Sequence, residues 1–425
     1  MSEIKTLMSS PLLENKRKIP VRFPTTKLNL FVFLLLMLSH LGCEDHSTTT
    51  EKQNELISAD QVQVEKLNAV CEDSKLTAME RARACISVAK LTNGNELDLG
   101  NMGLKSVPPE LFQLEGLKKL SLRNNSLGTI PAKLEQLKKL EDLDLARNTI
   151  RIVPASLFKL PKLARLDLED NQITSIEFSN APLPSLMTLR RIVLDKNQLT
   201  EFPDVLKGLK NIEEFYINDN RLTELPSEIG SFKTLKWLTA RNNQLTQIPD
   251  SIGQLASLEE LELGKNKISA IPPAIGGLTT LHVLSLSKNS LKQIPDSIGQ
   301  LHSLLYLNLA VNQLSHLPES LKGLEKLEVL SLSLNNFSAL PEVVTDLRGL
   351  KQLELIATGL TDLPKSLSKL VPLEDIELGY NKFVNVPRIL FELKKLKKVT
   401  IKDGNVPPLP KDSLKKLEAK GVKVF

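Results

Sequence analysis

A 23-residue pattern returns over most of this chain and limits its fold more than any other feature. The pattern reads L-x-x-L-x-L-x-x-N-x-L-x-x-L/I-P-x-x-L/I-x-x-L and begins at Leu97. One column holds asparagine at Asn125, Asn148, Asn171, Asn197, Asn220, Asn243, Asn266, Asn289, Asn312, Asn335 and Asn381. Thr358 fills one slot of this column, Met102 opens it and Gly404 closes it, which makes fourteen repeats. So regular a period indicates a solenoid, in which each repeat packs on its neighbours.

Each column of the pattern has a physical role. In the L-x-L segment alternate side chains face opposite ways, so the leucines enter a core while the intervening residues line an outer sheet surface. The asparagine amide can bond backbone groups that stacking removes from water. Proline lacks an N–H and suits the start of a short helical or extended segment. We therefore expect an α/β solenoid with a parallel concave sheet and short convex helical or extended segments.

These repeats resemble the leucine-rich repeat superfamily. The Leu-Pro step is similar to that of the Ras-suppressor-like and plant-intracellular type repeats, which are also common in bacterial surface proteins. Its proline column runs from Pro108 to Pro410 and is missing only in repeat 4, where residues 176–184 carry three extra residues. The resemblance implies a rigid horseshoe whose concave face binds a partner. In repeat 4 we expect a bulge or kink.

The N-terminal segment reads as an export signal. Basic residues precede nine apolar residues, Leu30–Leu38, and Gly42 stands before Cys43. This arrangement resembles the lipobox of bacterial lipoproteins, which implies acylation of Cys43 and a membrane-anchored protein of the cell envelope. We expect a signal peptide over 1–42 and a flexible polar tether over 43–58; ordinary cleavage nearby and an uncleaved signal anchor are the alternatives. The apolar run is shorter than the roughly 20 residues of a membrane span.

The two other cysteines also favour an exported protein. Acylation of Cys43 leaves Cys71 and Cys85 as a pair, so we predict a disulfide between them. Both stand in segments of helical periodicity, which predicts a helical N-terminal cap over 59–94 ahead of the repeats at 95–410. A C-terminal cap is expected over 411–425. Two buried free thiols in a cytosolic cap are the alternative.

Several variable positions of the predicted concave face carry apolar side chains. These are aromatic and aliphatic residues, which anchor many protein interfaces when a rigid surface displays them. We expect a contiguous, solvent-exposed strip over repeats 9–13, with Ala357 within it. The predicted protein-binding residues are Tyr216, Trp237, Val283, Tyr306, Val311, Val329, Leu334, Ile356 and Tyr380. The alternative is that valine and tyrosine simply favour strands.

Repeats 3–5 carry a different surface, rich in carboxylates. Its members are Asp142, Asp144, Asp167, Glu169, Asp170 and Asp195, with Arg147, Arg165 and Arg191 among them. Such a field could steer a basic partner or bind a cation. A solvated sheet with ion pairs across its strands is the alternative.

Charge and motifs narrow the function classes. The formal charge is +5, but residues 1–42 hold six Lys/Arg against two Glu, which leaves +1 for the rest and argues against nucleic acid. We find no metal-ligand, catalytic-triad or phosphate-loop pattern, and expect a monomeric, non-enzymatic protein without a cofactor or metal. A protein partner is expected, with a glycan as the weaker choice.

Two rival functions remain open. An intracellular scaffold similar to the Ras-suppressor-like group would carry residues 1–60 as a disordered arm. A glycosidase would use Asp144 and Asp167 as its carboxylates. The acidic residues of repeats 3–5 are the only feature of the sequence that supports this function. Residues 388–425, with eleven Lys/Arg against four acids, form either a solvated cap or a contact with an anionic membrane.

Overall fold

A computed structural model describes residues 61–425, except 180 and 405–407. The predicted signal peptide, the tether and Cys43 lie outside the described residues. The chain divides into two compact units, Met1–Leu67 and Asn68–Phe425. Of the first unit residues 61–67 are described, and they are helical.

The second unit begins with a small helical cap. Residues 68–72 are helical, and α4 (Ala78–Leu91) follows. Thr77 begins α4 through a capping box: its hydroxyl accepts from the Glu80 N–H, and the Glu80 carboxylate accepts from the Thr77 N–H. A disulfide joins Cys71 to Cys85, whose Cα atoms are 5.3 Å apart. It holds the two helical segments together as predicted, while buried Ile86 packs into the common core.

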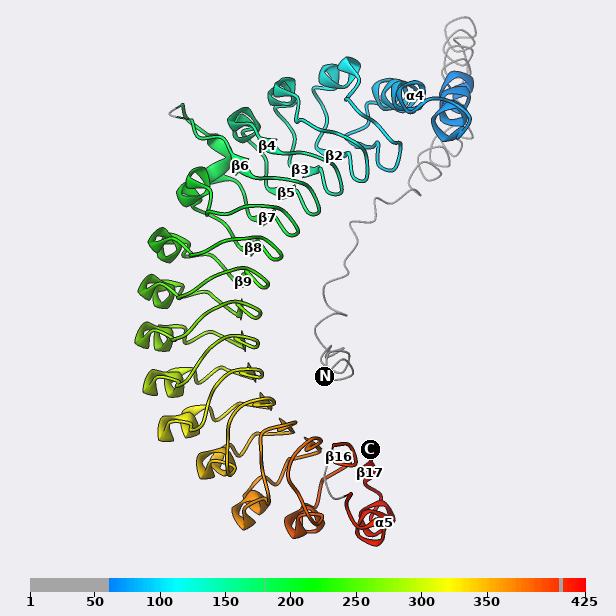
Figure 1. The fold of residues 1–425 in the computed structure, drawn as a ribbon. Coiled ribbons are helices and arrows are strands. Elements are labelled where there is room, and N and C mark those ends of the chain that lie inside the picture. Colours follow the sequence, from blue (N-terminus) through cyan, green and yellow to red (C-terminus); the bar gives the residue numbers. More distant parts are fainter. Residues whose placement is uncertain (1–60, 180, 405–407) are drawn as a thin grey trace, which may run out of the picture. The chain divides into compact units, whose positions relative to one another are not determined.

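The repeats form one parallel sheet of fifteen strands, with one strand per repeat and a last strand from the C-terminal cap. The strands line the inner side of an arc within this unit (Figure 1). In chain order they are β1 (Glu96–Asp98), β2 (Lys119–Ser121), β3 (Asp142–Asp144), β5 (Arg165–Asp167), β7 (Arg191–Val193), β8 (Glu214–Tyr216), β9 (Trp237–Thr239), β10 (Glu260–Glu262), β11 (Val283–Ser285), β12 (Tyr306–Asn308), β13 (Val329–Ser331), β14 (Gln352–Glu354), β15 (Asp375–Glu377), β16 (Lys398–Thr400) and β17 (Lys423–Val424). The α/β solenoid horseshoe expected from the pattern is confirmed.

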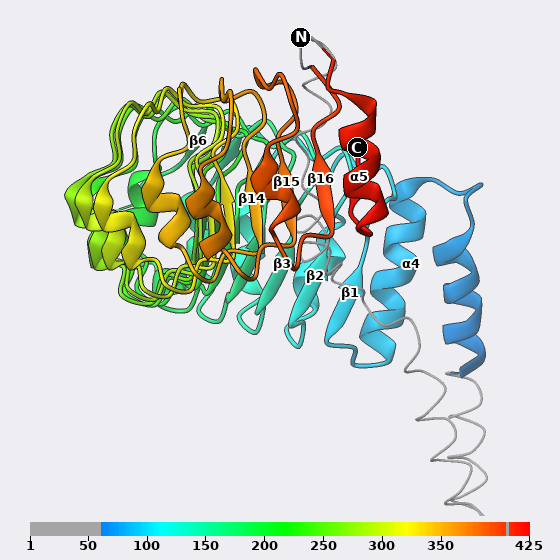
Figure 2. The same cartoon turned by 90° about the horizontal axis from the view of Figure 1, so that it is seen from below.

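Short 3-10 helices form the outer side of the arc, and Figure 2 shows them from a second direction. They are η1 (Pro109–Gln113), η2 (Ala132–Gln136), η3 (Ala155–Lys159), η4 (Pro184–Met187), η5 (Asp204–Gly208), η6 (Ser227–Ser231), η7 (Asp250–Gln254), η8 (Pro273–Gly277), η9 (Asp296–Gln300), η10 (Glu319–Gly323), η11 (Glu342–Asp346), η12 (Lys365–Lys369) and η13 (Arg388–Phe391). The column proline stands just before most of these helices in extended conformation, as Pro295 does with φ −69° and ψ 151°. Its carbonyl still accepts the first helical bond, from the Ile298 N–H at 3.1 Å.

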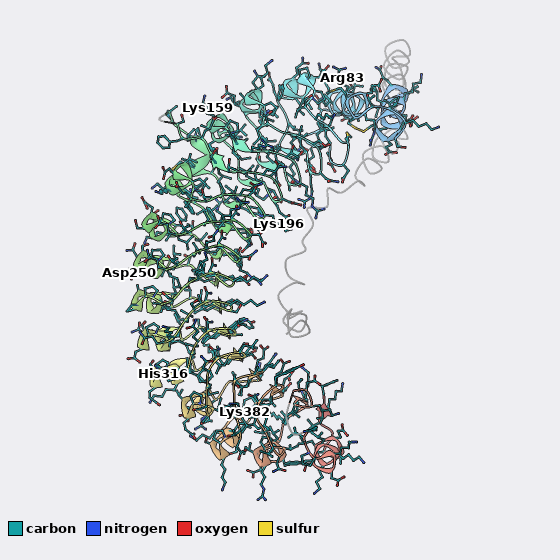
Figure 3. All side chains as sticks on the ribbon, in the orientation of Figure 1. Arg83, Lys159, Lys196, Asp250, His316 and Lys382 are labelled. Atoms are coloured by element: carbon teal, nitrogen blue, oxygen red, sulfur yellow. A yellow bond between two sulfur atoms is a disulfide. The ribbon has the colours of Figure 1, made fainter. Side chains whose placement is uncertain are left out.

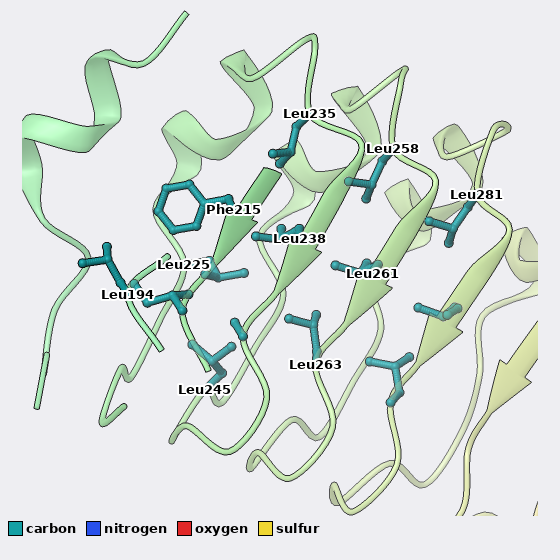
Figure 4. Close-up of a cluster of buried hydrophobic side chains, with 14 of the residues drawn as sticks. Leu194, Phe215, Leu225, Leu235, Leu238, Leu245, Leu258, Leu261, Leu263 and Leu281 are labelled. Carbon is teal, nitrogen blue, oxygen red and sulfur yellow. The ribbon is translucent and has the colours of Figure 1, made fainter. Parts of the chain in front are cut away.

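A continuous aliphatic core fills the space between sheet and helices. Leucines of successive repeats stack in columns, such as Leu238 on Leu261 in the middle of their strands (Figure 4). The fully buried Phe215 replaces leucine in the same column, and its ring stacks between those of Phe202 and Phe232, with centroids 5.4 and 6.3 Å away. Burial of such columns is the main stabilising contribution, because one repeat alone cannot cover its own apolar face.

The asparagine column links each repeat to the one before it. The Asn312 amide donates to the carbonyls of Leu286 and Leu309 at 3.0 and 2.9 Å, and its oxygen accepts from the Leu291 N–H at 3.0 Å. Repeat 12 departs from this pattern, because the Thr358 hydroxyl donates to the Leu355 carbonyl at 2.9 Å and Gly359 continues the turn at φ 86°. That φ favours glycine.

Repeat 4 and the C-terminal cap interrupt the pattern. The extra residues of repeat 4 follow a second, two-stranded parallel sheet of β4 (Ile152–Val153) and β6 (Ser175–Ile176), beyond which Phe178 is exposed. At the far end α5 (Lys411–Ala419) buries Leu417, and β17 pairs with β16. Among the described residues, every helix is too short or too polar to cross a membrane.

Candidate functional site

The concave sheet displays rows of side chains that run across the strands. The parallel pairing aligns each residue with the one 23 positions later, for example Val283 with Tyr306 and Tyr306 with Val329. Equivalent side chains therefore follow each other at the strand spacing of about 4.8 Å. Figure 3 shows Lys196 on this inner side and Asp250 on the outer side.

One row has an unusual backbone. The residue just before the asparagine column, which we call the exit residue, is left-handed in each of repeats 1–13, with φ between 52° and 59°. The first nine are polar and the next four are apolar or aromatic. In order they are Asn101, Asn124, Arg147, Asp170, Lys196, Asp219, Asn242, Lys265, Lys288, Val311, Leu334, Ala357 and Tyr380.

The solenoid itself imposes this conformation. Each exit N–H donates to a carbonyl of the next repeat, as Val311 does to Ser333 at 2.7 Å and Leu334 does to Ile356 at 2.7 Å. The ladder thus sets φ whatever the side chain is. A left-handed backbone costs an L-residue roughly 1–2 kcal/mol, less for asparagine and aspartate, and a β-branched residue is rare there. The tolerance of asparagine for a left-handed backbone explains the asparagines of this row, but it does not explain Val311.

The apolar residues of repeats 9–13 differ in two ways from the contiguous, exposed strip that the sequence suggested. Val283, Tyr306 and Val329 form one row, at the start of their strands. The apolar exit residues form the other, beyond the strand ends, and Ile356 stands one position before the exit residue Ala357. Between these two rows lies a polar row that includes Ser285, Asn308, Ser331 and Glu354. These apolar side chains are half-buried rather than fully exposed, because neighbours in a row cover one another.

Tyr306 stands at the centre of the first apolar row. Its hydroxyl oxygen accepts from the Asn308 amide at 3.1 Å. Burial and the negative charge of Glu354 raise the pKa of Tyr306 to about 12, so the phenol is protonated at neutral pH. The hydroxyl can therefore also donate to a ligand on this face.

Tyr216 and Trp237, the other two predicted aromatic residues on the strands, lie apart from the apolar side chains of these rows. Tyr216 on β8 donates to the Glu214 carboxylate at 3.1 Å, and the Arg191 guanidinium lies 4.7 Å from its ring centroid. Trp237 on β9 has the Lys236 ammonium 5.9 Å from its ring centroid, and Glu260 on β10 separates it from Val283. We therefore place both outside the apolar rows, although they share the concave face.

The acidic residues of repeats 3–5 are linked by internal contacts. Arg123 reaches three carboxylates, those of Asp144 and Asp167 at 3.6 Å each and that of Glu169 at 3.3 Å. Further pairs join Asp142 to Arg165 at 2.8 Å and Glu169 to Lys196 at 2.6 Å, whereas Asp170 is an exposed exit residue. These contacts favour the interpretation of a sheet with cross-strand ion pairs. Within the described part of the chain no group of three His, Cys, Asp or Glu is placed to hold a metal ion.

Burial changes how these carboxylates titrate. It raises the pKa of Asp144 to about 6, with a further contribution from the charge of Asp167. Burial also raises the pKa of Asp195 to about 6, against the hydrogen bonds that Asn218 donates to it. For Glu169 burial acts in the same direction, but Lys196 and Arg123 outweigh it and lower the pKa. The patch therefore changes charge in mildly acidic solution.

The left-handed exit row is the feature that sequence reasoning missed. A signal for it exists, because Asn and Asp occupy the exit position in five of the first seven repeats and are the residues that best tolerate this backbone. Val311, Leu334 and Tyr380 stand among the predicted protein-binding residues, but their residue types by themselves give no sign of a left-handed backbone.

Family models match two parts of the chain. A model described as leucine rich repeat matches residues 95–150 and 115–173, and one described as leucine-rich repeat region matches residues 261–354. No curated protein matches the chain at a significant level.

Three solved structures show how far the similarity extends. A leucine-rich repeat protein of Leptospira interrogans is 30% identical, with a TM-score of 0.67 over 80% of this chain and 91% of that one. The ectodomain of the plant receptor kinase GASSHO1/SCHENGEN3 of Arabidopsis thaliana, in complex with CASPARIAN STRIP INTEGRITY FACTOR 2, is 31% identical with a TM-score of 0.61 over 72% of this chain. TLR13 in complex with ssRNA13 is 28% identical with a TM-score of 0.64 over 76% of this chain.

The length of each match differs between these structures. The chain spans 39% of the plant ectodomain and 49% of TLR13, but nearly all of the Leptospira protein. With that identity over that length, together with the repeat models and the solenoid, the chain belongs to the leucine-rich repeat family.

Proposed function

We propose that this protein is an exported, lipid-anchored and non-enzymatic binding protein, and that a protein partner contacts the concave face of repeats 9–13. One observation carries the binding part: four successive exit residues, Val311, Leu334, Ala357 and Tyr380, place half-buried apolar side chains on a left-handed backbone.

Neither backbone preference nor solvation accounts for these four residues. Asparagine would suit both the left-handed conformation and the aqueous surface, and it stands at this position in Asn101, Asn124 and Asn242. Unfavourable local conformations persist where the surrounding structure enforces them, and they gather at functional sites. A row of apolar side chains on an accessible face is stabilised when a partner covers it.

The polar row beside them indicates the class of partner. Of the similar structures, one holds CASPARIAN STRIP INTEGRITY FACTOR 2 and another ssRNA13, so this architecture accepts different ligand classes. Here Glu354 and Glu377 stand half-buried at equivalent strand positions of repeats 12 and 13. Carboxylates repel phosphates, and nucleic-acid affinity depends on Lys and Arg contacts to phosphate. A protein surface with apolar side chains fits better.

Export and anchoring rest on the N-terminal sequence and the cap. Leu30–Leu38 and Cys43 supply the signal and the acylation site, and the disulfide between Cys71 and Cys85 is typical of oxidising compartments. An intracellular scaffold would keep these thiols reduced. The Leu-Pro column supports a further assignment, to the subclass similar to Ras-suppressor-like repeats.

Binding is tested with the double variant Val311→Asn, Leu334→Asn. Partners are crosslinked to full-length protein in its native membrane and quantified by mass spectrometry. We expect the specific partner to be lost from the variant and kept by Arg147→Asn, the same change of an exposed exit residue on the acidic half. Equal recovery by all three proteins would refute binding through these residues.

A further substitution separates binding from folding. Tyr306→Ala should leave the melting temperature nearly unchanged and weaken binding of the partner by about 2 kcal/mol or more if Tyr306 is an anchor. Loss of stability instead would show that this side chain is structural.

Anchoring is tested separately, by intact mass spectrometry and detergent partitioning of the native protein and of Cys43→Ala. A mature chain that starts at an acylated Cys43 is the expected result. An unprocessed chain that stays in the aqueous phase would refute anchoring and favour the intracellular scaffold.

A further inference from the structure

The exit ridge, defined as Val311, Leu334, Ala357 and Tyr380, presents one apolar side chain per repeat along a single line. Because the parallel sheet sets the spacing at about 4.8 Å, its three steps span roughly 14 Å. Tyr380 ends the line, with its ring against the backbone of Gly404, which leaves no space for a side chain there.

The backbone beneath the ridge is already hydrogen-bonded. The Val311 N–H donates to the Ser333 carbonyl at 2.7 Å, and its own carbonyl accepts from the Asn289 N–H at 3.2 Å. The N–H groups of Ala357 and Tyr380 donate to the next repeat at 2.9 and 2.7 Å. An extended peptide, which binds largely through its main chain, would find few groups to pair with here. A helix satisfies its own backbone and binds through side chains alone.

The spacing also favours a helix. Successive turns of a helix present side chains about 5.4 Å apart, which over three turns differs from the ridge by roughly 2 Å. Side chains on one face of an extended strand repeat at about 6.6–6.8 Å, so the same three steps would differ by roughly 6 Å. Apolar residues every three or four positions of a helix can therefore stay in register with all four repeats.

Charges flank the ridge unequally. The exit positions of the two preceding repeats are Lys265 and Lys288, so one end of the row is basic. On the strand side of the other end lies Glu354, which accepts from the Gln352 amide at 2.9 Å and forms no ion pair with a described Lys, Arg or His. The next acid, Glu377, is paired with Lys398 at 3.2 Å.

We propose that the exit ridge binds one amphipathic helix of the partner, which lies across repeats 8–13 with acidic residues near Lys265 and a basic residue near Glu354. This inference rests on the proposed function and adds the conformation, direction and charge of the segment that is bound. Only side chains that already lie on the concave face of this chain would contact the bound helix.

The test uses a display library of randomised 18-residue peptides, selected on the full-length protein in detergent. We expect enrichment of sequences with apolar residues every three or four positions that become helical on binding, as measured by circular dichroism. These peptides should bind at least tenfold more weakly to Val311→Asn, Leu334→Asn and equally well to Arg147→Asn. Unfolding curves of all variants in the same detergent control for folding.

Charge exchange tests the direction. Lys265→Glu should weaken the binding of peptides that carry acids at one end by several-fold, and replacing those acids with lysine should restore their binding. Glu354→Gln should weaken the same peptides through their basic residue at the other end. Binding that none of the three charge changes alters would overturn the proposed direction.

The remaining outcomes separate the two proposals. Peptides that depend on the ridge but show alternating apolar residues and bind in extended form would overturn the helix while the proposed function stands. No enrichment of ridge-dependent peptides, with the native partner still lost from the double variant, would also overturn the helix alone. A native partner retained by that variant would overturn both proposals.

Discussion

Removing one asparagine of the internal column should destabilise the solenoid measurably. The variant Asn312→Ala deletes an amide that is buried between repeats 9 and 10 and forms hydrogen bonds to both. Its partners are the Leu291 N–H and the carbonyls of Leu286 and Leu309. Because this backbone is removed from water, no solvent molecule can take over without disturbing the packing.

The magnitude follows from what each partner retains. The Leu286 carbonyl also accepts from the Asn289 amide at 3.0 Å, and the Leu309 carbonyl from the Asn335 amide at 3.0 Å. Each carbonyl therefore loses one of two amide bonds, about 0.5–1 kcal/mol, whereas the buried Leu291 N–H loses its acceptor, about 1–3 kcal/mol. We expect a decrease of the free energy of unfolding of about 2–5 kcal/mol.

The assay is guanidinium unfolding, combined with amide hydrogen exchange to locate the effect. Protection should fall first in repeats 9–11, because repeats are coupled through their nearest neighbours. Asn336→Ala is the matched control, since Asn336 is exposed and only its backbone N–H bonds another repeat, at 2.8 Å to Leu314. A loss below about 1 kcal/mol for Asn312→Ala, or an equal loss for the control, would refute this account of the column.

Three further predictions concern the acidic patch, the cap and the convex helices. Because burial raises the folded-state pKa of Asp195 to about 6 from an ordinary 3.8, its favourable contribution is present below 3.8 and lost as the pH rises through 6. Asp195→Asn should therefore raise the free energy of unfolding by about 1–2 kcal/mol at pH 7.5 relative to its effect at pH 4.5; the same effect at both values would contradict the shift. Cys71→Ala with Cys85→Ala opens a loop with a sequence separation of 14 and should destabilise the cap by about 3 kcal/mol, seen as faster exchange in α4, whereas unchanged exchange would argue that the bond is dispensable. In Gly253→Ala the added Cβ would meet the backbone of η8 and lower stability by about 1–3 kcal/mol, while Gly116→Ala, with open space around it, should not; equal melting temperatures would exclude this steric explanation.

The sequence alone was sufficient for the repeat architecture. A 23-residue period leaves one arrangement for the leucines, because alternate strand residues must enter the core and only stacking with a neighbour can cover them. The core positions Leu238 and Leu261, the bonding role of Asn312 and the Cys71–Cys85 disulfide all follow local patterns that can be read in one dimension.

The candidate site depended on tertiary structure for three reasons. Backbone conformation at the strand ends is imposed by hydrogen bonds to the next repeat, so the strain at Val311 follows from the tertiary structure and not from its residue type. How far a side chain is buried on the concave face depends on its neighbours 23 residues away. These neighbours leave Tyr306 half-buried rather than exposed. The ion pairs of Arg123 with Asp144 and Asp167 join side chains 21 and 44 positions apart, and only the curvature and pairing of the sheet bring them together.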